Sequence, residues 1–322
     1  MFSQISIYTG LLFLLLGFNV GILSGFFGVG GAFILTPLLN ILGLPMASAV
    51  GTGLFFAVIV SSLGGIRHYL AGNALIKISI IIGLISFFGI QASQPLVIYL
   101  DKLQLAGIYI RMLYIILLLA LGLLTFKKKN SHSSQNYNNQ PKTLKLFRKL
   151  KNLPPKIKIE PDTTPTSIWP MVMIAIVVGC LQGFLGVGGG FILVPVLIVF
   201  LNLKPHYAVG TSLVTIVISS IFATFLYFQA GKVLVPVSLL LGLGSLAGVS
   251  FGVSATFNIS GDALRKLYSL FLILTSLGIA LKSLNYNLIS MVYMLFLSIS
   301  ISLLILFRYY FKSRYTSLYK TK

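Results

Sequence analysis

The chain of 322 residues carries little charge, and only four of its side chains are acidic. Charged residues make up 9% of the sequence, well below the roughly 25% of soluble domains. Hydrophobic residues make up 57%, and the mean hydropathy is +0.99. This composition excludes an ordinary soluble domain and predicts an all-α, polytopic membrane protein.

Other scarce residue types exclude several kinds of chemistry. Cys180 is the only cysteine, so neither an intrachain disulfide nor a cysteine metal cluster can form. There are three histidines, and each acid falls between apolar runs or at the end of one. A membrane-embedded enzyme would need a nucleophile, a base or metal ligands at membrane depth. We therefore expect no catalytic residue, no metal and no cofactor.

Eleven apolar runs follow one another, with one long polar interruption. Their approximate ranges are 5–27, 30–44, 46–66, 74–98, 105–126, 169–185, 189–203, 206–230, 233–256, 263–283 and 287–308. A bilayer core of about 30 Å needs roughly 20 helical residues, so most of these runs can span it. The runs 30–44 and 189–203 are short, which predicts half-helices or short spans.

A glycine-rich segment occurs twice. Gly25–Pro37 reads GFFGVGGAFILTP and Gly183–Pro195 reads GFLGVGGGFILVP, identical at ten of thirteen positions. The two copies are 158 residues apart, and further matches follow each copy at a spacing of 159 or 160 residues: Pro45, Ala49-Val50-Gly51-Thr52 and Ala71-Gly72 against Pro205, Ala208-Val209-Gly210-Thr211 and Ala230-Gly231. Such self-similarity marks an internal duplication. It divides the chain into a first transmembrane repeat (1–126), a linker (127–168), a second repeat (169–285) and an extra span with a basic tail (286–322).

The linker holds ten lysine and arginine residues against Glu160 and Asp162. By the positive-inside rule, the linker and the basic tail are expected in the cytoplasm. Apolar residues recur every three positions from Leu144 to Leu153, a pattern typical of a helix that lies on anionic headgroups, with a disordered basic tether as the alternative. The expected partners of this positive charge are therefore lipid headgroups, and no nucleic acid.

Two cytoplasmic segments must be separated by an even number of crossings. This condition holds if 169–203 enters and leaves on one side and four spans follow, and the same counting puts the N-terminus outside. The two repeats are then inverted relative to each other, each containing a glycine-broken helix or hairpin, as in many secondary transporters. The count is seven full crossings and two hairpins. Arg67 and His68 end a span and are expected as anchors at the cytoplasmic interface.

The glycine clusters have the chemistry of an anion site. A helix that starts at such a cluster exposes unpaired N–H groups and the positive end of its dipole, about half an elementary charge, and glycine lets a ligand approach closely. Two inverted helix starts would form one site near the bilayer midplane. The alternative is that these glycines only allow close helix packing. The expected substrate-binding glycines are Gly28, Gly30, Gly31, Gly186, Gly188, Gly189 and Gly190.

Five polar residues are expected to complete the site. Ser24 and Gln182 precede the two copies of the segment, and Thr52, Thr211 and Ser212 begin the following spans. Their hydroxyl and amide groups can donate to an anion without adding charge, with Gln182 expected to donate to an anion oxygen. Each hydroxyl has an alternative role, which is to bond its own helix backbone at i−4.

The glycines are unsuited to a soluble dinucleotide loop, because no alternating strand precedes them. In addition, Ser48 stands where that motif needs an acid, about 20 positions on.

The duplicated GxxGxGGG/A-x-x-x-x-P segment, followed by P-x(3 or 4)-A-V-G-T, resembles the TauE/SafE sulfite-exporter family of membrane permeases. The resemblance covers both halves and leaves out the linker and the last span; Ala32 stands where the second copy has Gly190. It implies a permease for a small, sulfur-containing anion, of the sulfite or organosulfonate class, in the cytoplasmic membrane.

The alternative function is a membrane anchor or assembly component without transport. Since no acid lies within a span, proton coupling would run through the substrate or an interfacial histidine, and uniport and anion exchange remain open.

Overall fold

The computed structural model describes residues 7–127, 154, 156–157, 166–199, 201 and 203–319, and nearly all of these are helical. The first half contains α1 (Ile7–Phe27), α2 (Ala32–Ile41), α3 (Met46–Leu70), α4 (Ile76–Lys102) and α5 (Ala106–Lys127). The second contains α7 (Trp169–Leu185), α8 (Gly190–Val199), α9 (Pro205–Gln229), α10 (Val235–Phe257) and α11 (Gly261–Ser283), followed by α12 (Asn287–Tyr319). Between the halves, two-residue strands β1 (Lys156–Ile157) and β2 (Thr166–Ser167) pair antiparallel.

Eight helices in the described ranges are long and apolar enough to cross a bilayer, namely α1, α3, α4, α5, α9, α10, α11 and α12. This confirms the polytopic, all-α fold. The short runs 30–44 and 189–203 form helices of 10 residues each, α2 and α8. The helix of α12 continues to Tyr319 although its apolar run ends near 308. The helix expected over Leu144–Leu153 lies outside the described residues.

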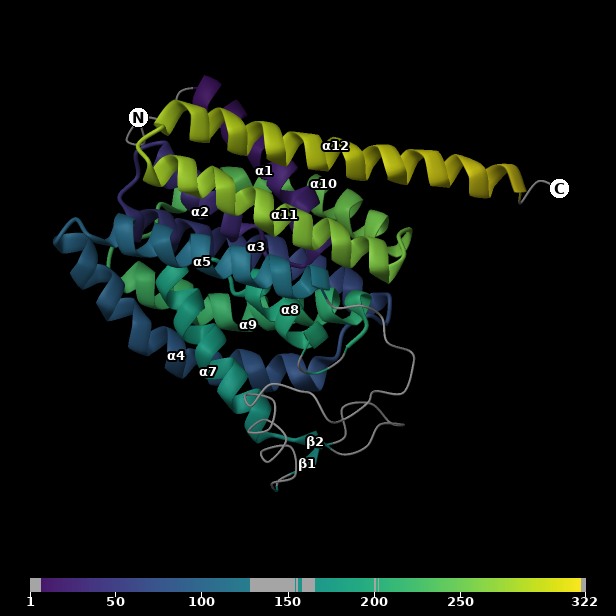
Figure 1. Ribbon diagram of the computed structural model, residues 1–322, viewed down its shortest axis with the longest axis horizontal. Coiled ribbons are helices and arrows are strands. Elements are labelled where there is room, and N and C mark those ends of the chain that lie inside the picture. The colour runs from purple at the N-terminus through teal and green to yellow at the C-terminus, as the bar shows by residue number, and fades with distance from the viewer. Residues whose placement is uncertain are drawn as a thin grey trace.

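Helices of the two halves pack in an exchanged pattern. Helix α1 lies against α10, and its counterpart α7 lies against α4, the counterpart of α10. The α3–α9 and α5–α11 contacts join each helix to its own counterpart (Figure 1). Glycines bring the backbones together: Gly17 and Gly25 of α1 contact the backbone of α10. At these helical glycines, the small-residue packing pattern of membrane helices is present.

The directions of the helices follow from residues that touch. Gly51, near the start of α3, lies against Lys232, which follows α9, and Gly210, near the start of α9, lies against Asn73, which follows α3. Helices α3 and α9 are therefore antiparallel. Along α2, Gly30 lies near Ser61 and Thr36 near Gly53, so α2 runs antiparallel to α3.

Helix α10 contacts both α1 and α3, and in each case the contacting residues follow in the same order along both helices. Gly17 and Gly25 of α1 face Leu241 and Val249, in that order, and Ser238 bonds Thr52. Since Gly64, farther along α3, also faces Val249, helices α1, α3 and α10 are parallel. The chain therefore reverses direction at the glycines between α1 and α2.

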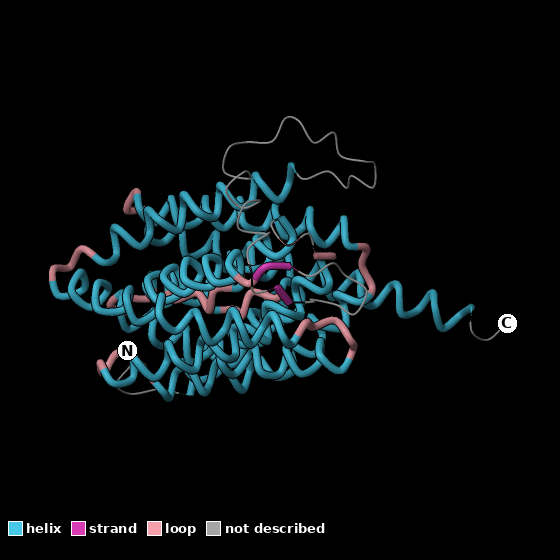
Figure 2. Tube along the Cα trace, turned by 90° about the horizontal axis from the view of Figure 1, so that it is seen from below, coloured by secondary structure: helices cyan, strands magenta, loops and turns pink. Residues whose placement is uncertain are grey.

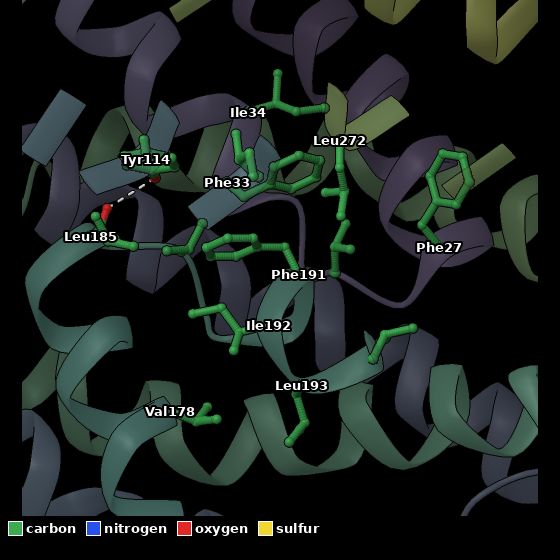
Figure 3. Packing of buried hydrophobic residues seen from close by; sticks show 14 of the residues in the cluster. Phe27, Phe33, Ile34, Tyr114, Val178, Leu185, Phe191, Ile192, Leu193 and Leu272 are labelled. Carbon is green, nitrogen blue, oxygen red and sulfur yellow. Dashed lines mark hydrogen bonds between the residues drawn. The ribbon is translucent and has the colours of Figure 1, made fainter. Parts of the chain in front are cut away.

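Aromatic rings fill the middle of the bundle around these reversals. Phe33 of α2 and Phe191 of α8 stack with ring centroids 6.1 Å apart, and Tyr114 of α5 stacks on Phe191 at the same distance (Figure 3). Helix α12 lies along α11 and extends past the ends of the other helices (Figures 1 and 2). Large apolar side chains also point outward, among them Phe88, Leu243 and Phe296, as expected for surfaces that face lipid.

Candidate anion-binding site

The two glycine segments form two buried loops that touch each other. The first loop joins α1 to α2 and has φ of +73°, +72° and +70° at Gly28, Gly30 and Gly31. The second joins α7 to α8 and has φ of +71°, +69° and +81° at Gly186, Gly188 and Gly189. Residues with a side chain rarely adopt this conformation, which explains why glycine recurs here. A methyl group added to Gly190 would lie 2.6 Å from Cα of Val29 in the first loop, so the loops are in contact.

Both loops end in glycines that directly precede a helix and whose N–H groups lack acceptors. In the described part of the chain, no carbonyl or side chain accepts from the N–H groups of Gly30, Gly31, Gly188 or Gly189. Within the first turn of α2, Ala32 N donates to Gly30 O at 2.8 Å and Ile34 N to Gly31 O at 3.3 Å. Unpaired N–H groups at a helix start attract negative charge, and here they lie inside the bundle.

The carbonyl groups of the second segment are held by side chains from four other helices. Tyr114 Oη donates to Leu185 O at 3.0 Å (Figure 3). Tyr227 Oη donates to Gly183 O at 2.7 Å, Thr36 Oγ1 to Gly186 O at 2.9 Å and Tyr268 Oη to Phe191 O at 2.8 Å. All four side chains are fully buried or nearly so. These bonds fix the orientation of the peptide groups around the loop, and with it the direction of the free N–H groups.

The first segment is held in a related way. Ser212 Oγ donates to Gly28 O at 2.6 Å, and His68 Nε2 lies 3.5 Å from Gly25 O. His68 is fully buried, with its ring 5.3 Å from that of Phe257, so its side chain packs inside the bundle. Its place in the last turn of α3 agrees with the predicted end of a span, and its depth in the membrane stays a prediction. Helix α3 continues to Leu70, beyond the end of its apolar run, and in its last turn His68 faces the bundle while Arg67, Tyr69 and Leu70 are exposed.

Three buried polar side chains beside the loops each have an oxygen without a hydrogen-bond partner. The oxygens Ser24 Oγ, Ser61 Oγ and Gln182 Oε1 are inaccessible to solvent and make no hydrogen bond. A methyl group added to Gly30 would lie 3.0 Å from Ser61 Oγ, and one added to Gly189 would lie 3.2 Å from Gln182 Oε1. Ser24 lies 3.5 Å from the corresponding point on Gly31 through its Cβ atom. Buried polar atoms in native proteins are normally paired, so these three atoms are candidates for contact with a ligand.

The amide nitrogen of Gln182 donates a hydrogen bond to another side chain of the protein. Its Nε2 donates to Ser220 Oγ on α9 at 3.0 Å, which leaves the carbonyl oxygen toward Gly189. The sequence suggested that this amide donates to an anion, whereas in the structure its donor already has an acceptor.

The remaining three predicted site hydroxyls hold helices together. Thr52 Oγ1 accepts from Leu234 N at 3.1 Å, and Thr211 Oγ1 accepts from Leu75 N at 3.0 Å. These N–H groups belong to the residues that precede α10 and α4, so each threonine caps a helix of the other half. Ser212 donates to Gly28 O, as described above. The site thus gathers the predicted glycines, Ser24 and Gln182, while both threonines bond elsewhere.

Sequence reasoning missed Ser61 and Ser220. Both are fully buried, and they occupy equivalent positions of α3 and α9, 159 residues apart in the sequence. That spacing matches the repeat and was the available signal. A serine within a membrane helix normally bonds its own backbone, so neither residue indicates a binding site when its sequence position is considered alone.

Acidic side chains in the described part of the chain lie at helix ends. Asp101, in the last turn of α4, accepts from Ala47 N at 3.2 Å and pairs with Lys232 Nζ at 3.0 Å. Asp262 lies in the first turn of α11, where it pairs with Arg265. The two acids within the described ranges therefore lie at helix ends, as predicted. Among the described residues, no group of three His, Cys, Asp or Glu side chains comes together.

Eight helices long and apolar enough to cross a bilayer, with two buried glycine loops that touch each other between them, define a polytopic membrane protein. The profile of the sulfite exporter TauE/SafE family matches residues 13–279 and also 172–316, and the chain belongs to this family of membrane transporters. The matches extend through the linker and α12, which the motifs alone did not cover.

Relatives with similar sequences have been named as transporters. A probable membrane transporter protein of Methanocaldococcus jannaschii is 27% identical over 274 residues, covering 80% of this chain and 90% of that protein. A probable membrane transporter protein of Bacillus subtilis is 27% identical over 251 residues, covering 76% and 90%. Sulfite exporter TauE/SafE family protein 6 of Arabidopsis thaliana is 27% identical over 123 residues, covering 36% of this chain and 29% of that protein. No solved structure matches the chain.

Proposed function

We propose that this transporter moves a small, sulfur-containing anion, of the sulfite or organosulfonate class, across the cytoplasmic membrane. The observation that carries the proposal is the meeting of unpaired N–H groups at the starts of α2 and α8 with the unpartnered oxygens of Ser24, Ser61 and Gln182. A buried arginine or lysine would be costly at membrane depth, whereas helix starts supply positive potential without a formal charge.

The two halves act as inverted repeats in this proposal. The antiparallel course of α3 and α9, and the reversal of the chain at the first glycine loop, support it. With the linker and tail in the cytoplasm, the N-terminus and the Asp101–Lys232 ion pair then face outward. The anion binds between the loops near the bilayer midplane, and alternating movement of the halves exposes it to either side.

Uptake by the purified full chain in liposomes tests the proposal. Radiolabelled sulfite should accumulate in liposomes that contain the protein and remain outside protein-free liposomes. Excess unlabelled sulfite and sulfoacetate should compete with the labelled anion. Protein that is folded and inserted, but takes up no anion in either orientation, would contradict the proposal and favour an anchoring or assembly role.

A further inference from the structure

The polar groups around the loops include acceptors as well as donors. Gln182 Oε1 is fully buried and has no donor, because the amide nitrogen of the same side chain is directed to Ser220 Oγ. An amide carbonyl can only accept a hydrogen bond. A ligand that satisfies this oxygen must therefore bring a proton of its own.

Two serine hydroxyls beside the loops, those of Ser24 and Ser61, can either donate or accept a hydrogen bond. Other serines of the bundle differ from them. Ser62 Oγ donates to Val58 O at 2.7 Å and Ser219 Oγ to Thr215 O at 3.0 Å, which is the usual i−4 bond of a serine in a membrane helix. Ser24 Oγ and Ser61 Oγ, by contrast, make no hydrogen bond although they are buried in helices of the same bundle. A hydroxyl without a fixed acceptor can rotate to donate to one ligand atom or accept from another.

The positive potential of the site matches a single negative charge. Each helix start contributes about half an elementary charge, so the starts of α2 and α8 together offer about one. A second negative charge on the ligand would be buried without compensation, which is unfavourable in a low-dielectric interior.

We propose that the site binds a small oxyanion of single charge that keeps one hydroxyl group, and that Gln182 Oε1 accepts the proton of that hydroxyl. The inference rests on the proposed function and narrows it to a protonation state: the hydrogen-oxyanion binds, the fully ionised dianion does not. Backbone N–H groups of both loops donate to the unprotonated oxygens, and Ser61 supplies a further donor. An anion that lacks the hydroxyl places an oxygen or a methyl group against the amide oxygen and leaves that oxygen unpaired.

Two pairs of singly charged anions test this inference on the unmodified protein. Hydrogen carbonate and nitrate are both planar and similar in size, and only the first carries a hydroxyl. Hydrogen sulfite and methanesulfonate form a second pair of sulfur anions, in which only the first carries a hydroxyl and the second is larger by a methyl group. Binding is measured by thermal shift and by competition with labelled sulfite uptake. We expect the hydroxyl-bearing member of each pair to bind roughly 10- to 100-fold more tightly, because its partner leaves a buried acceptor unsatisfied. Total sulfite should bind more weakly as rising pH converts hydrogen sulfite to the dianion.

Variants test whether Gln182 causes the preference for anions that carry a hydroxyl. Gln182→Met keeps the length of the side chain and removes the acceptor. In this variant, the ratio of the two affinities within each pair of anions should fall toward one. Ser219→Ala removes the hydroxyl next to Ser220 that bonds its own backbone, so this control should keep the ratio. If Gln182→Met does not fold, the affinity ratios measured on the unmodified protein still decide whether a hydroxyl is required. Equal binding within both pairs would overturn the inference and leave the permease proposal intact, whereas no binding of any of the four anions would contradict the permease proposal itself.

Discussion

Replacing Gly189 with alanine separates an anion site from simple helix packing. With φ of +81° at this position, the left-handed backbone costs an alanine about 1–2 kcal/mol of folding free energy. The new methyl group would lie 3.2 Å from both Gln182 Oε1 and Val178 Cγ1, in the space that an anion at the start of α8 must enter. The loss of one hydrogen bond to a charged ligand, about 1.5–3 kcal/mol, should lower uptake roughly 10- to 100-fold.

Gly231 provides the matched control. Its φ is +67°, so alanine meets a similar backbone cost, but a methyl group there would have no heavy atom within 4 Å. Both variants should melt at similarly reduced temperatures in detergent, while only Gly189→Ala loses uptake in liposomes. Equal uptake by the two variants, at equal stability, would refute the anion site. So would full uptake by a protein with alanine at both Gly30 and Gly189.

Three further predictions concern the site, the bundle and the topology. Gln182→Leu should weaken anion binding in a thermal-shift titration by about 1.5–3 kcal/mol, and unchanged affinity would remove this residue from the site. Asp101→Asn should lower the free energy of unfolding by about 1–3 kcal/mol, because it leaves the Lys232 ammonium and the Ala47 N–H without their carboxylate; a melting temperature equal to that of the unmodified protein would contradict this. A cysteine placed at Ser131 in a Cys180→Ala background should resist impermeant thiol reagents in intact cells, and labelling from outside would exclude the proposed orientation.

Hydropathy and the repeat were enough to predict most of the fold. Apolar runs long enough to span a bilayer gave the spanning helices, and the two clusters of consecutive glycines gave the chain reversals. The burial of the His68 side chain could not be predicted, because the end of an apolar run does not show which side chains of the last turn face the bundle. The contact of His68 with Phe257 of the other half depends on tertiary packing, which local hydropathy does not contain.

The candidate site could be predicted only in part, because some of its residues are recognised by local sequence and others by distant partners. The glycines and Gln182 stand out within a single segment of sequence. The roles of the threonines depend on partners far away in the chain: Thr52 bonds Leu234 and Thr211 bonds Leu75, across 182 and 136 residues. Nothing in the local pattern distinguishes a hydroxyl that caps a distant helix from one that faces a ligand.

The close contact between the two loops bears on how such a chain can be built from duplicated halves. Gly190 has no room for a methyl group, since one would lie 2.6 Å from Cα of Val29 and 2.7 Å from Gly28 O. The first half carries Ala32 at the equivalent position. A tandem fusion of two second halves would place glycine at both positions, whereas a fusion of two first halves would press an alanine methyl against the facing loop. The halves are therefore unequal building blocks, and only the second is suited to pairing with a copy of itself.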